Sequence, residues 1–449
     1  MKKSPEDHND EKIEESSELQ PLNMKRNDLP KDETDKVSSP NQPGPIQETS
    51  NPQKTYLRNC EMYFENDKLN LLQSLTPTDL FPKSILYPGQ SSPKTSSTDL
   101  MEIEKPSKIS FAHSLTTVHF HNDSIVYDLA IIGNLLVVVG DQYMKVYNIE
   151  NNELLSYYTI PHDNLYCVTL TEKNNSVIAA IGGQQLIIRI INLVTQREIR
   201  QLIGHKNEIY DLKFSPQNSA LLLSASKDTS IRLWNMESGV QICIFGGPLG
   251  HIAEVLAIEW HSSGEYFASS GIDNCVKLWA IIPKISEKIR NTENHLPIKT
   301  LIKTSPYFSC NTVHDNYIDC IRFNGNLIIT KSVDGLIKEW LPLFNREGDS
   351  YYIVNTFSYT TKEKIWYIKF CFDVEKNIIM VGNEAGKVHL FRVQDSEDIT
   401  NEENSNPVDV IDTKTDTIIR SIAYSNKYNI CAYASNRGDV IINHLNINS

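Results

Sequence analysis

The sequence of 449 residues lacks the motifs that usually carry catalysis. It contains no G-x-S-x-G nucleophile motif, no phosphate-binding P-loop and no H-E-x-x-H pair for a metal. A short glycine patch, IGGQQ at residues 181–185, is typical of a hairpin turn rather than of a phosphate cradle. The sequence therefore predicts a protein that is not an enzyme and needs no cofactor.

The cysteines also lack any pattern. All eight are scattered singly, without a C-x-x-C pair or a histidine at ligand spacing. Lone thiols favour a reduced intracellular protein over a disulfide framework, and they predict no metal site. No apolar run reaches the ~20 residues that a membrane-spanning helix needs, and the N-terminus has no apolar signal core. We expect a soluble protein of the cytosol or nucleus that does not bind membranes.

An excess of positive charge is missing too. The formal net charge is −13, which argues against a protein that itself grips nucleic-acid phosphates. The same charge is compatible with a Lys-rich or Arg-rich peptide as ligand. We therefore expect no direct contact with nucleic acid.

Residues 1–107 differ in composition from the rest of the chain. Residues 1–55 contain no aromatic residue and mix Lys, Glu, Asp, Ser and Pro, so they cannot bury enough apolar surface to fold. An apolar stretch near 55–81 suits either a partner-docking segment or a strap packed on the following domain. We expect a largely disordered acidic and polar tail over 1–107 and one domain over 108–449.

Three segments of that domain repeat one spacing. A His is followed after 20 to 23 residues by an Asp, a Trp comes six residues after the Asp, and a small hydroxyl residue precedes the Asp by four positions. The three sets are His205, Ser224, Asp228 and Trp234; His251, Ser269, Asp273 and Trp279; and His314, Thr330, Asp334 and Trp340. A spacing kept across windows of about 45 residues marks an internal repeat.

This repeat has the character of a four-stranded unit. The Asp stands in a tight turn, as in KDTS and VDGL, and the Trp closes a run that alternates polar and apolar residues. His, hydroxyl, Asp and Trp can form one buried hydrogen-bonded chain, which gives them a structural role. The spacing resembles the WD40 repeat, and four looser copies complete the count. We expect an all-β, seven-bladed WD40 β-propeller, with residues 282–312 as an extended insertion between blades 4 and 5.

The first strand of each blade lines the channel of such a propeller and carries an inward apolar pair. Two positions before this pair lies one comparable residue per blade. These residues are Tyr127, Tyr166, Tyr210, Leu256, Asp319, Trp366 and Arg420. Because blades 6, 7, 1 and 2 are neighbours in a closed ring, Tyr127, Tyr166, Trp366 and the adjacent Tyr367 are expected to converge at one side of the channel mouth. Tyr210 lies one blade further round, and we expect it at the rim.

Converging aromatic rings are suited to a methylated ammonium group. Such a cation keeps its charge but has lost hydrogen-bond donors, and each ring contact is worth about 0.5–2 kcal/mol. The residues alone leave open that these rings are ordinary packing between blades.

Specific stretches of the propeller resemble the EED/extra sex combs family, the WD-repeat subunit of Polycomb repressive complex 2. The matching segments include LLLSASKDTSIRLWN, IFGGPLGHIAEVL, HDNYIDCIRF and IWYIKF. The resemblance implies an aromatic cage for trimethyl-lysine of the histone H3 tail at Tyr127, Tyr166, Trp366 and Tyr367. It also implies a non-catalytic scaffold in the nucleus that supports transcriptional silencing.

The same resemblance implies the partners. A helical segment of a SET-domain histone methyltransferase would bind the propeller face opposite the cage, and an occupied cage would stimulate that enzyme, alongside other Polycomb complex subunits. The insertion 282–312 is a candidate contact for the enzyme or a solvent loop. Two alternatives remain: a scaffold without methyl-lysine reading, and a substrate adaptor of a ubiquitin ligase. The adaptor predicts an F-box or similar helical box before the propeller, which residues 1–107 do not display.

Overall fold

The computed structural model describes residues 111–120, 124–345, 348–359, 361, 365–393 and 406–447. The expected tail over 1–107, with its apolar stretch near 55–81, lies outside these described residues. Within them, no helix is long and apolar enough to cross a membrane.

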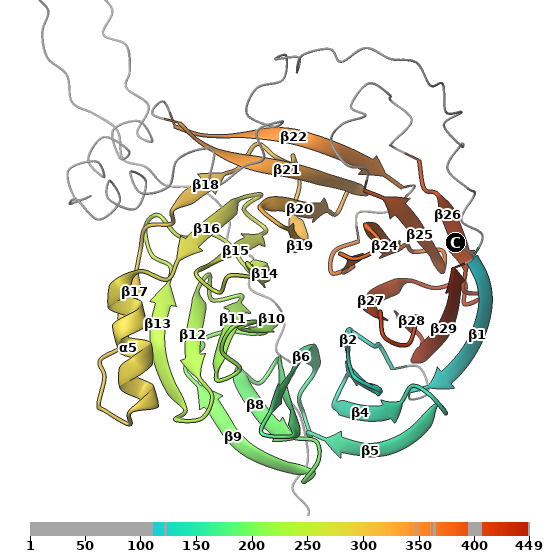
Figure 1. Cartoon of the computed structure of the whole chain (residues 1–449), viewed down its shortest axis with the longest axis horizontal. Helices are drawn as coiled ribbons and strands as arrows, with labels where there is room; N and C mark the ends of the chain where they lie inside the picture. Colours follow the sequence, from blue (N-terminus) through green and yellow to red (C-terminus); the bar gives the residue numbers. More distant parts are fainter. Residues whose placement is uncertain are drawn as a thin grey trace, which may run out of the picture. The chain divides into compact units, whose positions relative to one another are not determined.

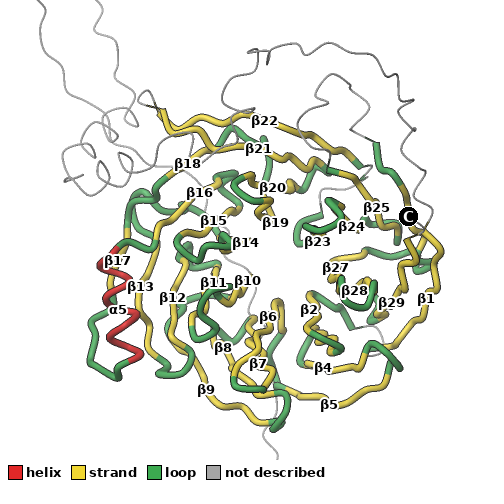
Figure 2. Tube along the Cα trace, in the orientation of Figure 1, coloured by secondary structure: helices red, strands yellow, loops and turns green. Residues whose placement is uncertain are grey.

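Seven small β-sheets stand around a central channel, and the chain passes through them in order (Figures 1 and 2). Within a sheet, consecutive strands pair antiparallel, so the innermost strand lines the channel and the outermost faces outward. Six sheets have four strands, and the third has a fifth. The prediction of a seven-bladed, all-β WD40 propeller is confirmed.

The blades are numbered from the first strand that lines the channel. Blade 1 comprises β2 (Asp128–Ile132), β3 (Leu135–Gly140), β4 (Tyr143–Asn148) and β5 (Glu153–Thr159). Blade 2 comprises β6 (Leu165–Lys173), β7 (Ser176–Gly183), β8 (Ile187–Asn192) and β9 (Arg197–Ile203). Blade 3 comprises β10 (Ile209–Phe214), β11 (Leu221–Ser226), β12 (Ile231–Asn235), β13 (Val240–Phe245) and the distant β17 (Leu301–Lys303).

The remaining blades follow the same plan. Blade 4 comprises β14 (Val255–Trp260), β15 (Tyr266–Gly271), β16 (Val276–Ala280) and β18 (Phe308–Cys310). Blade 5 comprises β19 (Ile318–Asn324), β20 (Leu327–Ser332), β21 (Leu336–Asn345) and β22 (Gly348–Ser358). Blade 6 comprises β23 (Cys371–Asp373), β24 (Ile378–Gly382), β25 (Lys387–Arg392) and β26 (Asp409–Asp412). Blade 7 comprises β27 (Ile419–Ser425), β28 (Ile430–Ser435), β29 (Asp439–Ile447) and β1 (Phe111–His119).

Blade 7 closes the ring with strands from both ends of the propeller. Strand β1 pairs antiparallel with β29, in register from Phe111 opposite Ile447 to His119 opposite Asp439. No strand was expected at residues 111–119. The alternation in FAHSLTTVH is a weak signal by itself, because its partner strand lies more than 300 residues away.

Apolar side chains fill the space between neighbouring blades. Between blades 3 and 4, for example, the rings of Phe245 and Phe267 lie 4.8 Å apart, and Trp279 lies 5.6 Å from Phe245. All three side chains are fully buried. The period-two alternation of the strands produces this arrangement, because it sends every second side chain into the gap between two sheets.

Two of the three predicted hydrogen-bonded sets are complete. In blade 4, the indole Nε1–H of Trp279 donates to Ser269 Oγ over 2.9 Å, and Ser269 Oγ lies 2.8 Å from His251 Nε2. The other ring nitrogen, Nδ1, lies 2.9 Å from the Asp273 carboxylate. The set His205, Ser224, Asp228 and Trp234 of blade 3 repeats these contacts at 2.7 to 2.9 Å. Each polar group in these buried chains is thus satisfied by the next one.

The third set, in blade 5, is incomplete, and this corrects the expectation for Asp334. Trp340 Nε1 donates to Thr330 Oγ1 over 3.0 Å, and that oxygen lies 2.9 Å from His314 Nε2. His314 Nδ1 is buried without a hydrogen-bond partner among the described residues. The carboxylate of Asp334 instead accepts a long bond from Leu336 N at 3.4 Å. The segment from His to Asp is two to three residues shorter here than in blades 3 and 4.

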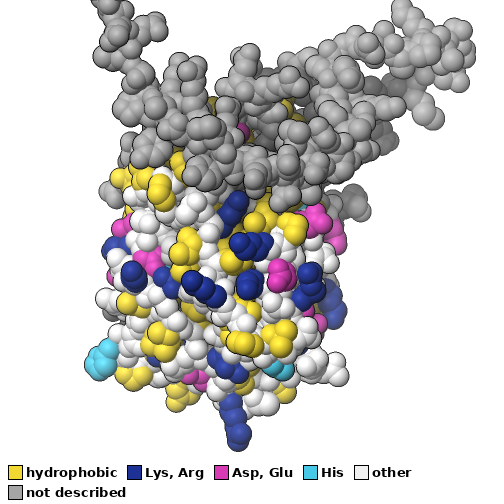
Figure 3. Space-filling model, turned by 90° about the vertical axis from the view of Figure 1, so that its left-hand side faces the viewer, with side chains coloured by type: hydrophobic (Ala, Val, Ile, Leu, Met, Phe, Trp, Pro, Cys, Tyr) yellow, Lys and Arg dark blue, Asp and Glu magenta, His cyan; other side chains and the backbone are white. Residues whose placement is uncertain are grey.

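The insertion 282–312 is folded, which corrects the expectation of an extended connection between blades. It contains helix α5 (Pro283–Glu293), which packs its buried Ile285 against the core of blades 3 and 4. Strand β17 adds in parallel to the outer edge of blade 3, and β18 is the outer strand of blade 4. Lys and Arg side chains are spread over the face that carries α5 and β17 (Figure 3). The signal for the helix was present: Pro283 begins it, and Ile282, Ile285 and Ile289 recur at helical spacing.

Candidate aromatic binding site at the channel mouth

Five aromatic side chains from four blades meet at one end of the central channel. Tyr127 precedes β2 of blade 1, Tyr166 lies in β6 of blade 2 and Tyr210 lies in β10 of blade 3. Trp366 and Tyr367 lie in the segment 365–370 that leads into β23 of blade 6. The innermost strands run in the same direction through the channel, which is why residues at their start reach the same end of it.

The ring centroids form a continuous cycle. Tyr127 lies 5.0 Å from Tyr166, Tyr166 lies 5.9 Å from Tyr210, and Tyr210 lies 5.7 Å from Trp366. Trp366 lies 5.6 Å from Tyr367, which lies 6.3 Å from Tyr127. Four of these five pairs meet edge to face, and the pair of Tyr166 and Tyr210 is tilted. The four residues expected to converge are therefore neighbours in one aromatic cluster.

Tyr210 also belongs to this cluster, which corrects the expectation that it would stay at the rim. Its side chain is 3 % exposed, and its ring lies within 6.4 Å of those of Tyr166, Trp366 and Tyr367. Trp366 joins the cluster through Tyr210 and Tyr367. The signal was in the sequence, since Tyr210 occupies the same slot before the inward pair as Tyr127 and Tyr166.

The members of the cluster differ in exposure. Trp366 is 45 % exposed, and Tyr127 and Tyr166 are partly exposed, so these three can meet a ligand from solution. Tyr367 is only 1 % exposed and forms the floor. Its phenol group reaches across the channel, where its oxygen lies 2.5 Å from the carbonyl oxygen of Tyr166 and 2.6 Å from that of Tyr210. Its single hydroxyl proton is donated to this pair of carbonyls, which ties blade 6 to blades 2 and 3.

All four tyrosines of the cluster are neutral at physiological pH. Burial raises the pKa of Tyr127, and it raises the pKa of Tyr166 to about 12, with a contribution from Glu208. Burial also raises the pKa of Tyr210 and of Tyr367. A cation at this site would therefore interact with ring faces and not with phenolate charge.

Charged residues flank the cluster on two sides. On the blade 3 side, the Tyr210 hydroxyl donates to Glu208 over 3.0 Å, and Lys227 lies 3.3 Å from Glu208 and 3.9 Å from Glu254. On the blade 7 side, the Arg420 guanidinium lies 5.8 Å from the Tyr127 ring and donates to the carbonyl oxygen of Trp366. The channel mouth is thus acidic at one side and basic at the other.

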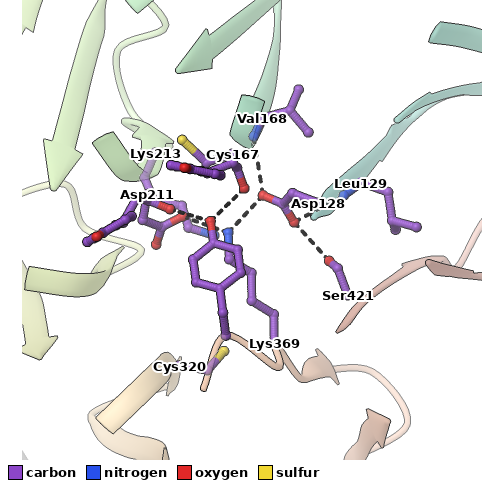
Figure 4. A network of polar contacts seen from close by, with 12 residues as sticks. Asp128, Leu129, Cys167, Val168, Asp211, Lys213, Cys320, Lys369 and Ser421 are labelled. Atoms are coloured by element: carbon purple, nitrogen blue, oxygen red, sulfur yellow. Dashed lines mark hydrogen bonds and ion pairs between the residues drawn. The ribbon is translucent and has the colours of Figure 1, made fainter. Parts of the chain in front are cut away.

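A buried ionic network closes the channel beneath the aromatic floor (Figure 4). The Lys369 ammonium lies 2.7 Å from Asp128 of blade 1 and 3.1 Å from Asp211 of blade 3, and 5.2 Å from the Tyr367 ring. Ser421 of blade 7 donates to Asp128, and Asp128 also accepts from the backbone N–H of Val168. The two carboxylates raise the pKa of Lys369 well above its usual value, although burial opposes them. A ligand entering between the rings would therefore stop at Tyr367.

No group of three or more His, Cys, Asp or Glu side chains in the described part of the chain is arranged to hold a metal ion. The cysteines described are free thiols, and most are buried. Burial raises the pKa of Cys371 to about 11, so that thiol is not poised as a nucleophile. The chemistry that the channel mouth offers is recognition by aromatic faces.

A family model, the WD domain, G-beta repeat, matches residues 196–235 and 242–280. The chain is 34 % identical over 276 residues to Polycomb protein esc of Drosophila melanogaster, a match that covers 58 % of this chain and 64 % of the relative. It is 34 % identical over 239 residues to Polycomb group protein FIE1 of Oryza sativa subsp. japonica, covering 52 % and 51 % of the two chains. The chain thus spans less than two thirds of the length of these curated relatives.

Chains of Polycomb complexes are among the solved structures with the same fold. A chain of Chaetomium thermophilum Polycomb Repressive Complex 2 bound to GSK126 superposes with a TM-score of 0.64 at 15 % identity, covering 74 % of this chain and 98 % of that chain. A chain of ctPRC2 in complex with H3K27me3 and H3K27M gives a TM-score of 0.63 at the same identity and coverage. The family resemblance stated from the sequence is confirmed: this seven-bladed WD-repeat propeller is a homologue of the Polycomb proteins esc and FIE.

Proposed function

We propose that this chain is the non-catalytic scaffold of a Polycomb-type histone methyltransferase complex and reads trimethyl-lysine on the histone H3 tail. The observation that carries this proposal is the aromatic cluster at the channel mouth. The centroids of neighbouring rings from blades 1, 2, 3 and 6 lie 5.0 to 6.4 Å apart. Trp366 is partly exposed to solvent, and Tyr367 beside it is buried. These residues are far apart in the sequence, and the circular arrangement of the blades brings them together.

The physical basis is the chemistry of a methylated ammonium. Trimethylation removes the hydrogen-bond donors of lysine but leaves the positive charge, so the cation loses less hydration on entering an aromatic site. Three or four contacts of about 0.5–2 kcal/mol each add up to about 2–8 kcal/mol. Micromolar affinity corresponds to about 8 kcal/mol, so flanking contacts of the peptide must offset the cost of ordering it. The neutral phenols of Tyr127 and Tyr166 and the indole of Trp366 supply these contacts. The solved ctPRC2 complex with H3K27me3 supports the choice of ligand.

The opposite end of the channel is suited to the enzyme partner. The innermost strands end there on partly exposed apolar side chains, which an amphipathic helix could cover. These side chains are Ile131, Leu170, Phe214, Phe323, Phe372 and Tyr424. We assign this face to a helical segment of the SET-domain methyltransferase. An occupied cage stimulates that enzyme if the peptide binds the active arrangement of the complex more tightly than the inactive one. Such a role implies action in the nucleus, in support of gene silencing.

A scaffold without methyl-lysine reading is the second candidate, and one observation favours it. Tyr127 and Tyr166 are already in edge contact at 5.0 Å, and Arg420 lies over the Tyr127 ring. In a pure scaffold, the Arg420 guanidinium and the contacts between the rings would only pack the blades together. A substrate adaptor of a ubiquitin ligase gains no support from the described residues.

The reader role is tested by peptide binding. We expect the full chain to bind an H3 tail peptide with trimethyl-lysine at micromolar order and the unmodified peptide much more weakly. Trp366→Ala and Tyr127→Ala should each weaken binding by about tenfold or more, because each loses a cation–π contact. Tyr157→Ala is a matched control, since this tyrosine is 65 % exposed on outer strand β5.

Two results decide between the candidates. Unchanged binding in Trp366→Ala and Tyr127→Ala would contradict the reader role and leave the pure scaffold. Affinity purification from nuclei followed by mass spectrometry should recover a SET-domain methyltransferase. If ubiquitin-ligase subunits appear in its place, the adaptor is the correct assignment.

A further inference from the structure

The inner segment of blade 6 departs from the plan of the other blades. Residues 365–370 form no strand, and the regular strand β23 begins only at Cys371. Within this segment, Tyr367 has a backbone φ of +69°, in the left-handed region that bulky side chains seldom occupy. A conformation of this kind persists only where its surroundings hold it, and such residues cluster at functional sites.

The left-handed residue explains how two consecutive side chains reach one site. In a regular strand, neighbouring side chains point to opposite faces of the sheet, so Trp366 and Tyr367 could not pack on the same partner. Here their rings lie 5.6 Å apart, and both contact Tyr210, at 5.7 and 6.4 Å. The turn at Tyr367 leaves Trp366 exposed as a wall and buries Tyr367 as the floor.

One carboxylate from the neighbouring blade holds this turn. Asp319 Oδ2 accepts hydrogen bonds from the backbone N–H of Tyr367 over 2.9 Å and from that of Ile368 over 3.1 Å. Asp319 is fully buried, and the ammonium of Lys331, also fully buried, lies 2.7 and 2.9 Å from its two oxygens. The lysine neutralises the carboxylate, and Asp319 in turn raises the pKa of Lys331 against the effect of burial.

Two other buried aspartates also accept a backbone N–H group from the next blade. Asp128 accepts from Val168 N over 3.2 Å, and Asp211 accepts from Ile258 N over 3.0 Å, so each links its blade to the next one. Both contacts end within strands, β6 and β14. Asp319 differs from them, because it binds two successive N–H groups around a left-handed residue.

We propose that Asp319, neutralised by Lys331, is the positioning residue of the methyl-lysine site: it fixes the turn that sets Trp366 and Tyr367 against Tyr210. This inference rests on the proposed function for its ligand. Asp319 occupies the slot of blade 5 that holds a tyrosine in blades 1, 2 and 3. Blade 5 thus contributes no ring and instead orients the two rings of blade 6.

The test uses Asp319→Asn, Asp319→Ala and Asp373→Asn in the full chain. Asp373→Asn is the matched control, because Asp373 is also buried and accepts two successive backbone N–H groups, those of Glu375 and Lys376, but lies at the far end of β23. We expect Asp319→Ala to weaken binding of the trimethyl-lysine H3 peptide by about tenfold, equivalent to about 1.4 kcal/mol. Asp319→Asn keeps an acceptor oxygen and should lose less, while Asp373→Asn should stay within about twofold of the wild type.

Tryptophan fluorescence gives a readout that does not depend on the ligand. Of the five tryptophans, Trp366 is 45 % exposed and the other four are at most 4 % exposed. Acrylamide quenching therefore reports mainly on Trp366. In Asp319→Ala we expect stronger quenching, because the indole leaves its contacts with Tyr210 and Tyr367. Asp373→Asn should lower the melting temperature without this change in quenching.

The outcomes separate the inference from the function on which it rests. If the wild type binds no methylated peptide but quenching rises only in the Asp319 variants, the reader role fails and the positioning role stands. If the Asp319 variants and Asp373→Asn change quenching and affinity alike, Asp319 acts only on overall stability and the inference is overturned. Wild-type quenching in Asp319→Ala overturns it as well.

Discussion

Blades 4 and 6 represent two uses of one architecture. In blade 4, Trp279 is fully buried, its indole N–H begins a complete hydrogen-bonded chain, and the innermost strand β14 is continuous from Val255 to Trp260. In blade 6, Trp366 is 45 % exposed and stands in an irregular segment beside a left-handed residue. The first tryptophan stabilises the ring of blades, and the second offers its face to solution. Regularity in this molecule accompanies stability, and departures from it mark the channel mouth.

Replacing each tryptophan by alanine should give the largest contrast. Trp279→Ala removes a large side chain from the core between blades 3 and 4 and leaves Ser269 without a donor, which should cost about 3–5 kcal/mol. Trp366→Ala should cost about 1 kcal/mol or less, because the indole is half exposed. Denaturant unfolding followed by circular dichroism measures both. Similar losses in the two variants would refute this division of roles.

The aspartates of the repeat sharpen the comparison at a smaller scale. Asp273 is buried and accepts from His251 Nδ1 and from the backbone N–H groups of Ile252 and Cys275. Asp273→Ala leaves these donors unpaired and should destabilise the fold by about 1–3 kcal/mol. Asp334→Ala, in the incomplete set of blade 5, should cost only a few tenths of a kcal/mol, about the loss of one weak bond. Thermal unfolding of the two variants measures this difference. Equal decreases in melting temperature would contradict the conclusion that the set in blade 4 is complete and the set in blade 5 is not.

A third expected effect is a pH dependence at His314, in the incomplete set of blade 5. Burial and the nearby Lys338 lower the pKa of His314 to about 3, from 6.5 in an exposed histidine. Below pH 6.5 the unfolded chain takes up a proton that the folded ring does not, so the stabilisation is complete well above that pH and declines as the pH falls. The decline at His314 should be about 1 kcal/mol between pH 6.5 and 5.5.

A His314→Gln variant checks this assignment. Glutamine does not titrate in this range, so the variant should lose less stability than the wild type between pH 6.5 and 5.5, even if it is less stable at neutral pH. The two curves are measured by denaturant unfolding at each pH. Parallel curves would show that other groups control the acid sensitivity.

The sequence was sufficient for features that repeat. The spacing of His205, Asp228 and Trp234 recurs because three blades use the same buried chain of hydrogen bonds. It predicted both the fold and two complete hydrogen-bonded sets. The slot before the inward pair predicted which side chains share the channel mouth, including Tyr127 and Tyr166. Their role in binding methyl-lysine stays a prediction.

Features that depend on pairing between distant segments were not predictable in the same way. Strand β17 pairs with β13 of blade 3, although three strands of blade 4 lie between them in the sequence. No local sequence pattern indicates this partner. The missing bond at Asp334 follows from a slightly shorter segment, whose effect appears only in three dimensions. The left-handed backbone at Tyr367 has no residue signature, because it is held by Asp319 from another blade. Tyr210 was expected at the rim because blades 3 and 6 are not neighbours in the ring, but its ring meets that of Trp366 across the channel, 5.7 Å away.

The pairing of β1 with β29 has a consequence for biosynthesis. His119 and Asp439, which face each other at one end of this pair, are separated by 320 positions along the chain. A ribosome releases β1 long before β29 has been made, so β1 has no partner strand while the residues between them are synthesised. Contacts of such long range form late and slowly. The ring is completed only when β29 has left the exit tunnel, and until then blade 7 exposes an open sheet edge.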